Sequence, residues 1–418
     1  MKRALIILTT TFPYGTGEAF LESEVPFLRK DNNTSVFFVP REHFQPSSKS
    51  RTIPNGMQAL LTEFRPSLIG CIIHVFFLRE FYSDLLYLIF SRGFTFLRLK
   101  RLISFLTKSR YIYLRLLNLR SNWENSDNII IYSYWFHRSA YAACKLKEYE
   151  QKLGKKVYAF SRCHRFDVYE NFDDSQYLPL RRFMFEKLDK VFSISNDAIK
   201  YFQANYSMVP QDKFALSRLG TIDRGLSKKS NDRIFRIVSC SNCIAVKRVG
   251  LILNALYAIK STKVFWTHFG DGIELPDLKI KAERLQATNP NIHAIFRGQV
   301  SNIEILKYYT ENPVDLFVNA SMSEGIPVSI MEAMSFGIPV IAPDVGGISE
   351  CILLNSMLLL KSDFSTNDLS NSIISFMGLS DSEIDSIRTQ SRKKWEETYD
   401  AAINYKLFSD TIQRIFDK

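Results

Sequence analysis

Short apolar runs alternate with longer helix-like stretches along most of this 418-residue chain, and this alternation limits the fold more than any other feature. Each run ends in a loop or at a helix start. Short strands separated by helices predict parallel sheets built from βαβ units. Five such runs lie in the first half of the chain: RALIILTT (3–10), NTSVFFVP (33–40), NIIIYSYW (128–135), KKVYAFSR (155–162) and DKVFSISN (189–196).

The sequence changes character at residues 220–233 (GTIDRGLSKKSNDR), which are polar and rich in turn-forming residues. This composition predicts a linker between two domains. A second series of strand-like runs follows: IFRIVSCS (234–241), KVFWTHFG (263–270), NIHAIFRG (291–298), VDLFVNAS (314–321) and IPVIAPD (338–344). We therefore expect two doubly wound, Rossmann-like α/β domains, residues 1–222 and 234–394. They should face a cleft in which ligands bind beyond the carboxyl ends of the strands.

The C-terminal region has the pattern of helices. Ser380 and Glu383 have the spacing of a capping box, which predicts a helix start at this point. We expect the last helix, from about residue 395 to residue 418, to pack back on the first domain.

The cysteines and the N-terminal residues limit the classes of protein to which this chain can belong. Six cysteines are too few for a disulfide framework. Cys240 and Cys243 (CSNC) have redox or zinc spacing, but a zinc site needs about four ligands and no second pair exists, so we expect buried thiols at a strand end. The N-terminal apolar run, residues 4–8, is too short for a secretory signal, which indicates a protein that is not secreted.

Basic charge is concentrated in residues 65–120, which hold ten Lys or Arg against two acidic residues, whereas the whole chain has a net charge of +11. The longest uncharged run there, residues 66–78, has 13 residues, and a bilayer-spanning helix needs about 20. Basic residues interleaved with Phe, Tyr, Leu and Ile suit helices that lie in an anionic membrane interface, which we favour. The alternatives are a core helix pair with a solvated basic face, and a nucleic-acid patch, although no nucleic-acid motif accompanies it.

Two glutamates bracket an apolar run in SEGIPVSIMEAMSFGIPVIA (323–342). We predict a strand over 315–319, a loop over 320–326, and a helix over 328–336 with Pro327 in its first turn and Gly337 at its C-terminal end. Glu324 then lies at the helix mouth and Glu332 more than a turn inside. The helix N-terminus between them can bind a diphosphate, and either carboxylate can accept hydrogen bonds from sugar hydroxyls.

The longer segment SEGIPVSIMEAMSFGIPVIAPDVGGISE (323–350) resembles the retaining glycosyltransferases of family 4, which have the GT-B fold. The Glu-x7-Glu spacing, the Gly-x-Pro, the Glu-Ala-Met and the Gly-Gly before Glu350 all fall in register. The resemblance implies that Glu332 binds the ribose hydroxyls of a nucleotide sugar and that Glu324 contacts the transferred sugar. It also implies that four backbone positions approach the sugar and phosphate: Gly325, Ile326, Pro327 and Val328.

Other segments of the second half fit the same family. Lys247 matches the lysine that neutralises the diphosphate. Asn242 stands where the family often has Arg, and Arg248 stands where Gly is common, so we expect Lys247 and Arg248 to share this role. Within HFGDG (268–272) and FRGQVSNIEILKYY (296–309), the resemblance places Gly298 and Gln299 near the base.

TTFPYGTGEAFLESEVPFL (10–28) resembles the family's glycine loop. Gly15 and Gly17 allow the backbone to approach the diphosphate or the acceptor. Glu18 either holds an acceptor hydroxyl or caps a helix. Pro26 falls inside the expected helix, which predicts a kink or a later helix start.

YAFSRCHRFDVYE (158–170) resembles the family's histidine segment near the reacting sugar. We expect His164 to contact the sugar or the acceptor, although Arg165 replaces the usual Gly. Arg162 and Asp167 either orient His164 or bind the acceptor. His137, in YSYWFHRSA (132–140), is a weaker acceptor candidate for which a structural role is the simpler interpretation.

The resemblance implies transfer of a hexosyl or N-acetylhexosaminyl group from a nucleotide-diphosphate sugar to an acceptor hydroxyl, with retention and without a metal or cofactor. We favour a uridine over a guanosine carrier, and a lipid-linked acceptor of bacterial surface-polysaccharide synthesis, met at the cytoplasmic face of the inner membrane. Rival hypotheses are a nucleotide-sugar epimerase of the same fold and a non-catalytic membrane or nucleic-acid binder. A nicotinamide-dependent dehydrogenase would need a full Gly-x-Gly-x-x-Gly, and the first loop has only GTGEAF.

Overall fold

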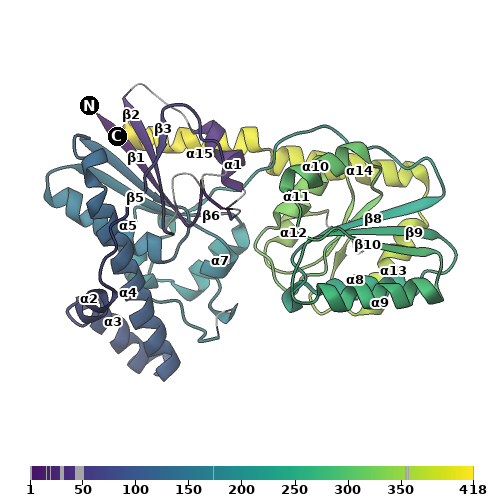
Figure 1. The fold of residues 1–418 in the computed structure, drawn as a ribbon, viewed down its shortest axis with the longest axis horizontal. Helices are drawn as coiled ribbons and strands as arrows, with labels where there is room; N and C mark the ends of the chain where they lie inside the picture. Colours follow the sequence, from purple (N-terminus) through teal and green to yellow (C-terminus); the bar gives the residue numbers. More distant parts are fainter. Residues whose placement is uncertain are drawn as a thin grey trace. The chain divides into compact units, whose positions relative to one another are not determined.

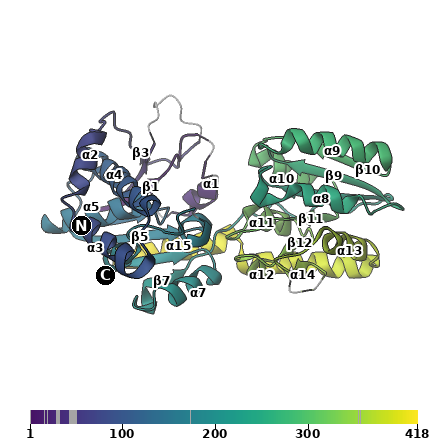
Figure 2. The same cartoon turned by 90° about the horizontal axis from the view of Figure 1, so that it is seen from below.

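The computed structural model describes residues 2–15, 17–18, 20–28, 33–42, 51–172, 174–353, 355 and 357–417, and the chain divides into two compact units. Unit 1 comprises Met1–Ser217 and Tyr405–Lys418, and unit 2 comprises Arg218–Asn404 (Figures 1 and 2). The first segment of unit 1 therefore ends earlier than the predicted boundary at residue 222. Its second segment begins later than the predicted helix start near residue 395. The chain from residue 218 to residue 404 belongs to unit 2.

A seven-stranded parallel sheet forms the centre of unit 1, with the strand order β3-β2-β1-β4-β5-β6-β7. The five predicted runs all contribute strands. The two edge strands, β3 and β7, have three residues each and were not predicted. The strands are β1 (Arg3–Thr9), β2 (Thr34–Pro40), β3 (Met57–Ala59), β4 (Asn128–Ser133), β5 (Lys156–Cys163), β6 (Lys190–Ser193) and β7 (Phe214–Leu216).

Helices cover this sheet, and side-chain caps define several of their starts. Ser67, Thr95 and Ser195 each accept a hydrogen bond from a backbone N–H in the first turn of the following helix. The helix that begins after the glycine loop stops at Glu24 and continues as a 3₁₀ turn over Val25–Phe27, which accommodates Pro26. The helices are α1 (Phe20–Glu24), α2 (Leu68–Val75), α3 (Arg79–Tyr87), α4 (Phe96–Asn118), α5 (Arg138–Lys152), α6 (Arg181–Lys187) and α7 (Asn196–Asn205).

The C-terminal helix α15 (Ala401–Phe416) begins in unit 2 and ends in unit 1. Its Phe408 ring lies 5.1 Å from the Tyr132 ring of β4 and 5.2 Å from the Phe192 ring of β6, measured between centroids. Asn128 Nδ2 donates to the Phe416 carbonyl at 3.1 Å. The end of the chain is therefore part of the unit 1 core.

Unit 2 has a six-stranded parallel sheet with the order β10-β9-β8-β11-β12-β13. The strands are β8 (Ile234–Cys240), β9 (Lys263–Phe269), β10 (Ile292–Phe296), β11 (Leu316–Val318), β12 (Val340–Pro343) and β13 (Leu359–Leu360). The helices are α8 (Val249–Leu256), α9 (Leu275–Thr288), α10 (Asn302–Glu311), α11 (Val328–Ser335), α12 (Ile348–Cys351), α13 (Thr366–Met377) and α14 (Asp381–Thr398). The capping box of Ser380 and Glu383 at the start of α14 is confirmed. Two α/β units with parallel sheets are the predicted fold class.

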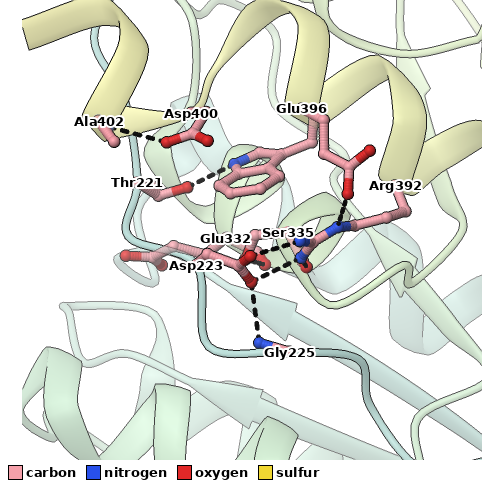
Figure 3. Close-up of polar contacts among 10 residues, drawn as sticks. Thr221, Asp223, Gly225, Glu332, Ser335, Arg392, Glu396, Asp400 and Ala402 are labelled. Carbon is pink, nitrogen blue, oxygen red and sulfur yellow. Dashed lines mark hydrogen bonds and ion pairs between the residues drawn. The ribbon is translucent and has the colours of Figure 1, made fainter.

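The predicted linker is held against α14 (Figure 3). Arg392 donates to both carboxylate oxygens of Asp223, at 2.8 and 2.6 Å, and also to the carbonyl of Ser335 at the end of α11. Trp395 Nε1 donates to Thr221 Oγ1 at 2.8 Å. The linker therefore follows a fixed path on unit 2, next to the helix that carries Glu332.

The basic segment 65–120 folds into α2, α3, a π-helical turn over Leu88–Arg92, and α4. One face of α4 lies in the core of unit 1, as the core-helix alternative proposed. The stretch from residue 64 to residue 97 is different, because many large apolar side chains are exposed there: Phe64, Leu68, Ile69, Ile72, Ile73, Phe76, Phe77, Tyr82, Leu86, Ile89, Phe90, Phe94, Phe96 and Leu97. We call these residues the 64–97 apolar surface. Among the described residues, no helix combines the length and the apolar content that a bilayer span requires.

Candidate functional site

An ion pair joins two strand-end loops of unit 2. Lys247 lies in a 3₁₀ turn after β8, and Glu324 lies in the loop between β11 and α11. Because β8 and β11 are parallel neighbours, their carboxyl ends meet at one edge of the sheet. The Lys247 Nζ atom lies 2.5 Å from Glu324 Oε1, and Asn319 Nδ2 donates to the same oxygen at 3.4 Å. The structure thus brings together the lysine and the first glutamate that the sequence singled out.

Backbone contacts fix the two loops. Met322 N donates to the Val246 carbonyl at 2.8 Å, and Gly347 N donates to the Gly325 carbonyl at 2.8 Å. Gly346 has φ +56°, and a Cβ atom there would lie 1.9 Å from the carbonyl oxygen of Glu324. The Gly-Gly of the sequence motif therefore supports the loop that carries Glu324.

We expect Gly346→Ala to destabilise unit 2 by about 1–3 kcal/mol, because alanine there is strained at positive φ and its Cβ displaces the Glu324 backbone. Hydrogen exchange of the unit 2 peptides would measure the loss. Gly225→Ala is the matched control, since Gly225 also has a positive φ but a Cβ atom there would meet nothing within 4 Å. Equal losses in both variants would show that the contact with Glu324 is unimportant.

Glu332 lies inside α11 and is 5% exposed. Asn302 Nδ2, at the start of α10, donates to Glu332 Oε1 at 2.6 Å. Burial raises the pKa of Glu332 to about 7, and the hydrogen bond from Asn302 and the charge of Arg224 oppose this shift. The hydrogen bonds of the neighbouring residues Asp223 and Gly225 hold this part of the linker, and with it Arg224, near Glu332. Asn302 and Arg224 were not singled out from the sequence, because both act through folding contacts that no local motif signals.

The N-terminus of α11 lies between the two glutamates. Pro327 is the N-cap, with φ −70° and ψ 123°, one position earlier than the predicted first turn. Ile326 is buried and Gly325 is part of the loop contact described above. The first N–H groups of the helix, from Val328 on, give this edge of the sheet a partial positive charge. The arrangement can therefore bind an anion beside two carboxylates.

Arg248 contacts the loop that precedes Glu324. Its backbone has φ +49°, and its guanidinium donates to the carbonyls of Ala320, at 2.8 Å, and Ser321, at 3.4 Å. It also lies 4.5 Å above the Phe364 ring. These contacts support the loop before Glu324, and a role shared with Lys247 at the diphosphate stays a prediction.

Gly298 and Gln299 lie in the loop after β10. Gly298 has φ +67°, and its carbonyl accepts a hydrogen bond from Gly270 N at 2.9 Å. Gln299 is exposed. Gly270 and Gly272 in turn pack on the loop that precedes Lys247, where Cβ atoms would lie 1.9 Å from the Ser241 carbonyl oxygen and 2.4 Å from that of Cys243. The base-binding role of Gly298 and Gln299 stays a prediction.

Cys240 and Cys243 are free cysteines, as expected. Cys243 is buried, with its Sγ atom 3.3 Å from His268 Nε2, whereas Cys240 is partly exposed. Burial raises the pKa of both thiols, to about 12 for Cys240 and about 11 for Cys243. Such thiols are poor nucleophiles at neutral pH.

In unit 1, His164 follows β5 and is enclosed by aromatic rings. The Trp135 ring lies 4.3 Å away and the Tyr134 ring 5.3 Å away, measured between centroids. Neither imidazole nitrogen has a hydrogen-bond partner among the described residues. Burial lowers the pKa of His164 well below its ordinary value, and the charge of Arg162 adds to this effect. The ring is therefore neutral, with one N–H and one lone pair left unused.

Arg162 cannot bind an acceptor, because its side chain is fully buried. Its guanidinium pairs with Glu24, donates to Ser217 Oγ at 3.0 Å and lies 4.4 Å from the Phe408 ring. The acceptor role suggested for Arg162 is therefore wrong. The residue joins α1, β5 and α15 instead.

Asp167 is also fully buried, which excludes direct contact with an acceptor. Its carboxylate accepts from the backbone N–H groups of His164, at 2.5 Å, and Phe136, at 2.7 Å. Of the two roles suggested, orientation of the His164 segment is the one that these contacts support. Burial raises the pKa of Asp167 to about 7, while the Arg181 charge and the backbone donors oppose the shift.

The glycine loop after β1 is closed by Glu18, which has φ +60°. Its carboxylate accepts from the N–H groups of Thr10, Thr11 and Phe12, each at 2.8 Å, and from Trp135 Nε1 at 2.5 Å. We therefore assign Glu18 to the loop itself and no longer to an acceptor hydroxyl.

The two glycines of this loop have backbone roles. Gly15 has φ +64°. A Cβ atom at Gly17 would lie 2.9 Å from Thr11 Oγ1. The missing side chain therefore lets the Gly17 backbone pack closely against Thr11.

His137 is the N-cap of α5 and is mostly buried. Its ring lies 5.1 Å from the Phe105 ring in an edge-on arrangement. It also lines a cavity of about 340 Å³ at the carboxyl ends of β1 and β4, which is bounded by Thr10, Thr11, Gly17, Glu18, Arg41, Trp135, His137, Arg138 and Phe166. Burial lowers the pKa of His137 well below its ordinary value, and Arg138, Arg181, Arg41 and Arg101 add to this effect.

Comparison with known proteins defines the class of unit 2. Residues 225–397 match the family model of glycosyl transferases group 1, so unit 2 contains a group 1 glycosyltransferase domain. The putative teichuronic acid biosynthesis glycosyltransferase TuaC of Bacillus subtilis (strain 168) is 42% identical over 67 residues, which cover 16% of this chain and 17% of that protein. The amylovoran biosynthesis glycosyltransferase AmsK of Erwinia amylovora is 24% identical over 218 residues, which cover 49% of this chain and 52% of that protein. The matches thus span about half or less of these curated relatives.

Likeness to solved structures extends over both units. The crystal structure of Anabaena Alr3699/HepE in complex with UDP and glucose matches with a TM-score of 0.66 and 15% sequence identity, covering 99% of this chain and 100% of that chain. At this identity the likeness shows the fold. It confirms the predicted GT-B class, two Rossmann-like α/β units.

Proposed function

We propose that this chain is a retaining glycosyltransferase that moves a sugar from a nucleotide-diphosphate sugar to an acceptor hydroxyl. The observation that carries the proposal is the edge of unit 2 where Lys247, Glu324, Glu332 and the N-terminus of α11 come together. The group 1 match over this unit supports it. Unit 2 would bind the donor, and unit 1 the acceptor.

The roles follow from charge. Lys247 and the first turn of α11 would stabilise the negative charge that develops on the departing diphosphate. Glu332 would accept hydrogen bonds from the ribose hydroxyls, and Glu324 would contact the transferred sugar. The bond between the anomeric carbon and the phosphate oxygen breaks as the acceptor oxygen bonds the same face of that carbon. The leaving phosphate oxygen takes the acceptor proton, so neither a protein base nor a metal is required. Contact of His164 with the sugar or the acceptor stays a prediction, because both imidazole nitrogens are buried.

We favour a uridine diphosphate sugar carrying a hexosyl or N-acetylhexosaminyl group, as the complex of Alr3699/HepE with UDP and glucose suggests. The names of TuaC and AmsK support a role in bacterial polysaccharide biosynthesis. The 64–97 apolar surface, with the basic residues around it, would hold the enzyme at the cytoplasmic face of the inner membrane, next to a lipid-linked acceptor.

Calorimetric titration with UDP, GDP and their sugars tests the donor site. One nucleotide sugar should bind with a Kd on the order of 1 μM to 1 mM. Glu332→Gln should weaken it about 10- to 100-fold, because hydrogen bonds to a charged acceptor are lost. The wild-type affinity should rise from pH 6 to pH 8, since the pKa of Glu332 is about 7 and the ionised carboxylate accepts from both hydroxyls.

A sugar-linked diphosphate has no group that titrates in this range, so the pH dependence should disappear in Glu332→Gln. Glu283→Gln, at an exposed position on α9, is the matched control and should bind like the wild type. If no nucleotide sugar binds the folded protein, the proposed function fails.

A further inference from the structure

One amide side chain reaches the buried carboxylate of Glu332 from the start of α10. Asn302 Nδ2 donates to Glu332 Oε1 at 2.6 Å, across 30 positions of the sequence. Glu332 is 5% exposed, whereas Asn302 is exposed. Among the described residues, the other carboxylate oxygen, Oε2, accepts no hydrogen bond. The amide therefore occupies one oxygen of Glu332 and leaves the second without a partner.

The capped start of α10 fixes where this amide lies. Ser301 Oγ accepts a hydrogen bond from Glu304 N at 3.3 Å, and Ser301 N donates to Glu304 Oε2 at 2.8 Å. This capping box gives the first turn a defined conformation, and Asn302 is the residue that directly follows the cap. Asn302 is thus placed by the helix start, independently of its own bond to Glu332.

The role proposed for Glu332 needs the ionised carboxylate. A protonated carboxyl group carries a hydrogen on one oxygen, so it has less capacity to accept hydrogen bonds from two ribose hydroxyls. Burial favours this protonated form, and it raises the pKa of Glu332 to about 7 even with the Asn302 bond in place. An N–H donor on Oε1 favours the ionised form, because a hydrogen bond to a charged oxygen is stronger than one to a neutral oxygen.

Other titratable groups of the described chain that surround Glu332 are Cys240, Tyr309, Arg224, Asp223 and Arg392. Burial keeps the thiol and the phenol neutral, since it raises the pKa of Cys240 to about 12 and that of Tyr309 well above its ordinary value. The Arg392 guanidinium pairs with Asp223 (Figure 3). The guanidinium of the linker stays charged and lowers the pKa of Glu332. A change of affinity between pH 6 and pH 8 therefore reports on Glu332.

We propose that Asn302 is a positioning residue of the donor site, which holds the Glu332 carboxylate ionised and in a fixed orientation for the ribose. The inference rests on the proposed function in one respect, namely that Glu332 accepts from the ribose hydroxyls. The opposite role is a block, in which the amide takes the place of a hydroxyl and must leave before the donor binds. Because Oε2 has no partner in the described protein, the amide need not leave.

The ionisation of Glu332 is measured first, without a ligand. NMR titration of the full chain, isotopically labelled at the glutamate side-chain carboxyl carbons, follows the resonance that Glu332→Gln removes. Asn302→Leu is similar in size but has no donor, so it should raise the midpoint from about pH 7 by about one unit. Asn302→Asp should raise the midpoint further, because it places a second carboxylate beside Glu332. An acidic residue suits the first turn of a helix, so this variant retains α10.

Binding of UDP-glucose at pH 6, pH 7 and pH 8 is measured next, by calorimetry. For midpoints about one unit apart, the ionised fractions of Glu332 predict that Asn302→Leu binds about ninefold, fivefold and twofold more weakly than the wild type, in that order. A variant that only disturbed the fold would lose the same factor at each pH. Asn302→Gln keeps an amide and should stay closer to the wild type than Asn302→Leu.

Asn367→Leu is the matched control, because Asn367 is also an exposed asparagine in the first turn of a helix that begins with a capping box, α13. It should change neither the Glu332 midpoint nor the Kd. An unchanged midpoint in Asn302→Leu would overturn the inference, and so would tighter binding of UDP-glucose, which the blocking role predicts. If no nucleotide sugar binds the wild type, the proposed function fails, and the NMR titration still decides whether Asn302 holds Glu332 ionised.

Discussion

Replacing Lys247 by alanine is expected to lower the turnover number about 10²- to 10³-fold, the loss typical of removing one group that stabilises charge in the transition state. The variant removes the positive charge nearest to the proposed diphosphate, and it leaves the Glu324 carboxylate without the ammonium group that lies 2.5 Å from it. The affinity for the donor should fall less than the turnover number, because the diphosphate, although already negative in the donor, gains further charge as the bond breaks. Release of nucleoside diphosphate from the donor identified by titration measures the rate.

Two further variants make this result specific. Lys247→Arg keeps the charge and should retain more activity than Lys247→Ala. Arg233→Ala removes an exposed charge at the end of the linker and should turn over at the wild-type rate. A Lys247→Ala enzyme within about threefold of the wild type would show that leaving-group stabilisation comes from elsewhere, with the N-terminus of α11 as the remaining candidate.

Glu24→Ala is expected to destabilise unit 1 by about 3–5 kcal/mol, because it leaves the Arg162 guanidinium buried without its counter-charge. Both partners are almost completely excluded from solvent, at 1% and 0% exposure. The loss is local to unit 1, so hydrogen exchange that resolves the peptides of the two units is the suitable measurement.

The double variant Glu24→Leu/Arg162→Met separates the charge from the packing. It removes both ions and fills the site with apolar groups of similar length, and it should recover most of the stability lost in Glu24→Ala. If the single variant is as stable as the wild type, the pair is not the link between α1, β5 and α15 that its contacts suggest. If the double variant is as unstable as the single one, the site depends on the shape of the guanidinium between the Tyr132 and Phe408 rings rather than on its charge.

The sheets and the loops of the donor side could be predicted because their signals are local. Apolar runs that end in turn residues gave the main strands, and the spacing of Glu324 and Glu332 around Pro327 gave a loop and a helix start. β3, β7 and β13 were missed because two or three residues are too few to show a period. Their pairing is decided by the sheet edge that is already present.

The roles of buried polar residues could not be predicted, because they depend on partners far away in the sequence. Arg162 lies in a motif that suggests a binding site, yet its partner Glu24 is 138 positions away. Asn302 reaches Glu332 over 30 positions. Arg248 has the charge of a phosphate ligand, but its positive φ directs the side chain to the loop before Glu324. In each case the residue type was informative, and only the folded contacts decided its role.

The return of α15 to unit 1 has a consequence for synthesis on the ribosome. Unit 2 is one continuous segment, 218–404, placed between the two parts of unit 1. All of unit 2 is therefore translated before Phe408, the residue whose ring packs on Tyr132, Phe192 and the Arg162 guanidinium. Domains generally fold as units during translation. Unit 2 can thus reach its native state first. Unit 1, although most of it is translated earlier, completes its core only when residues 405–418 have been synthesised.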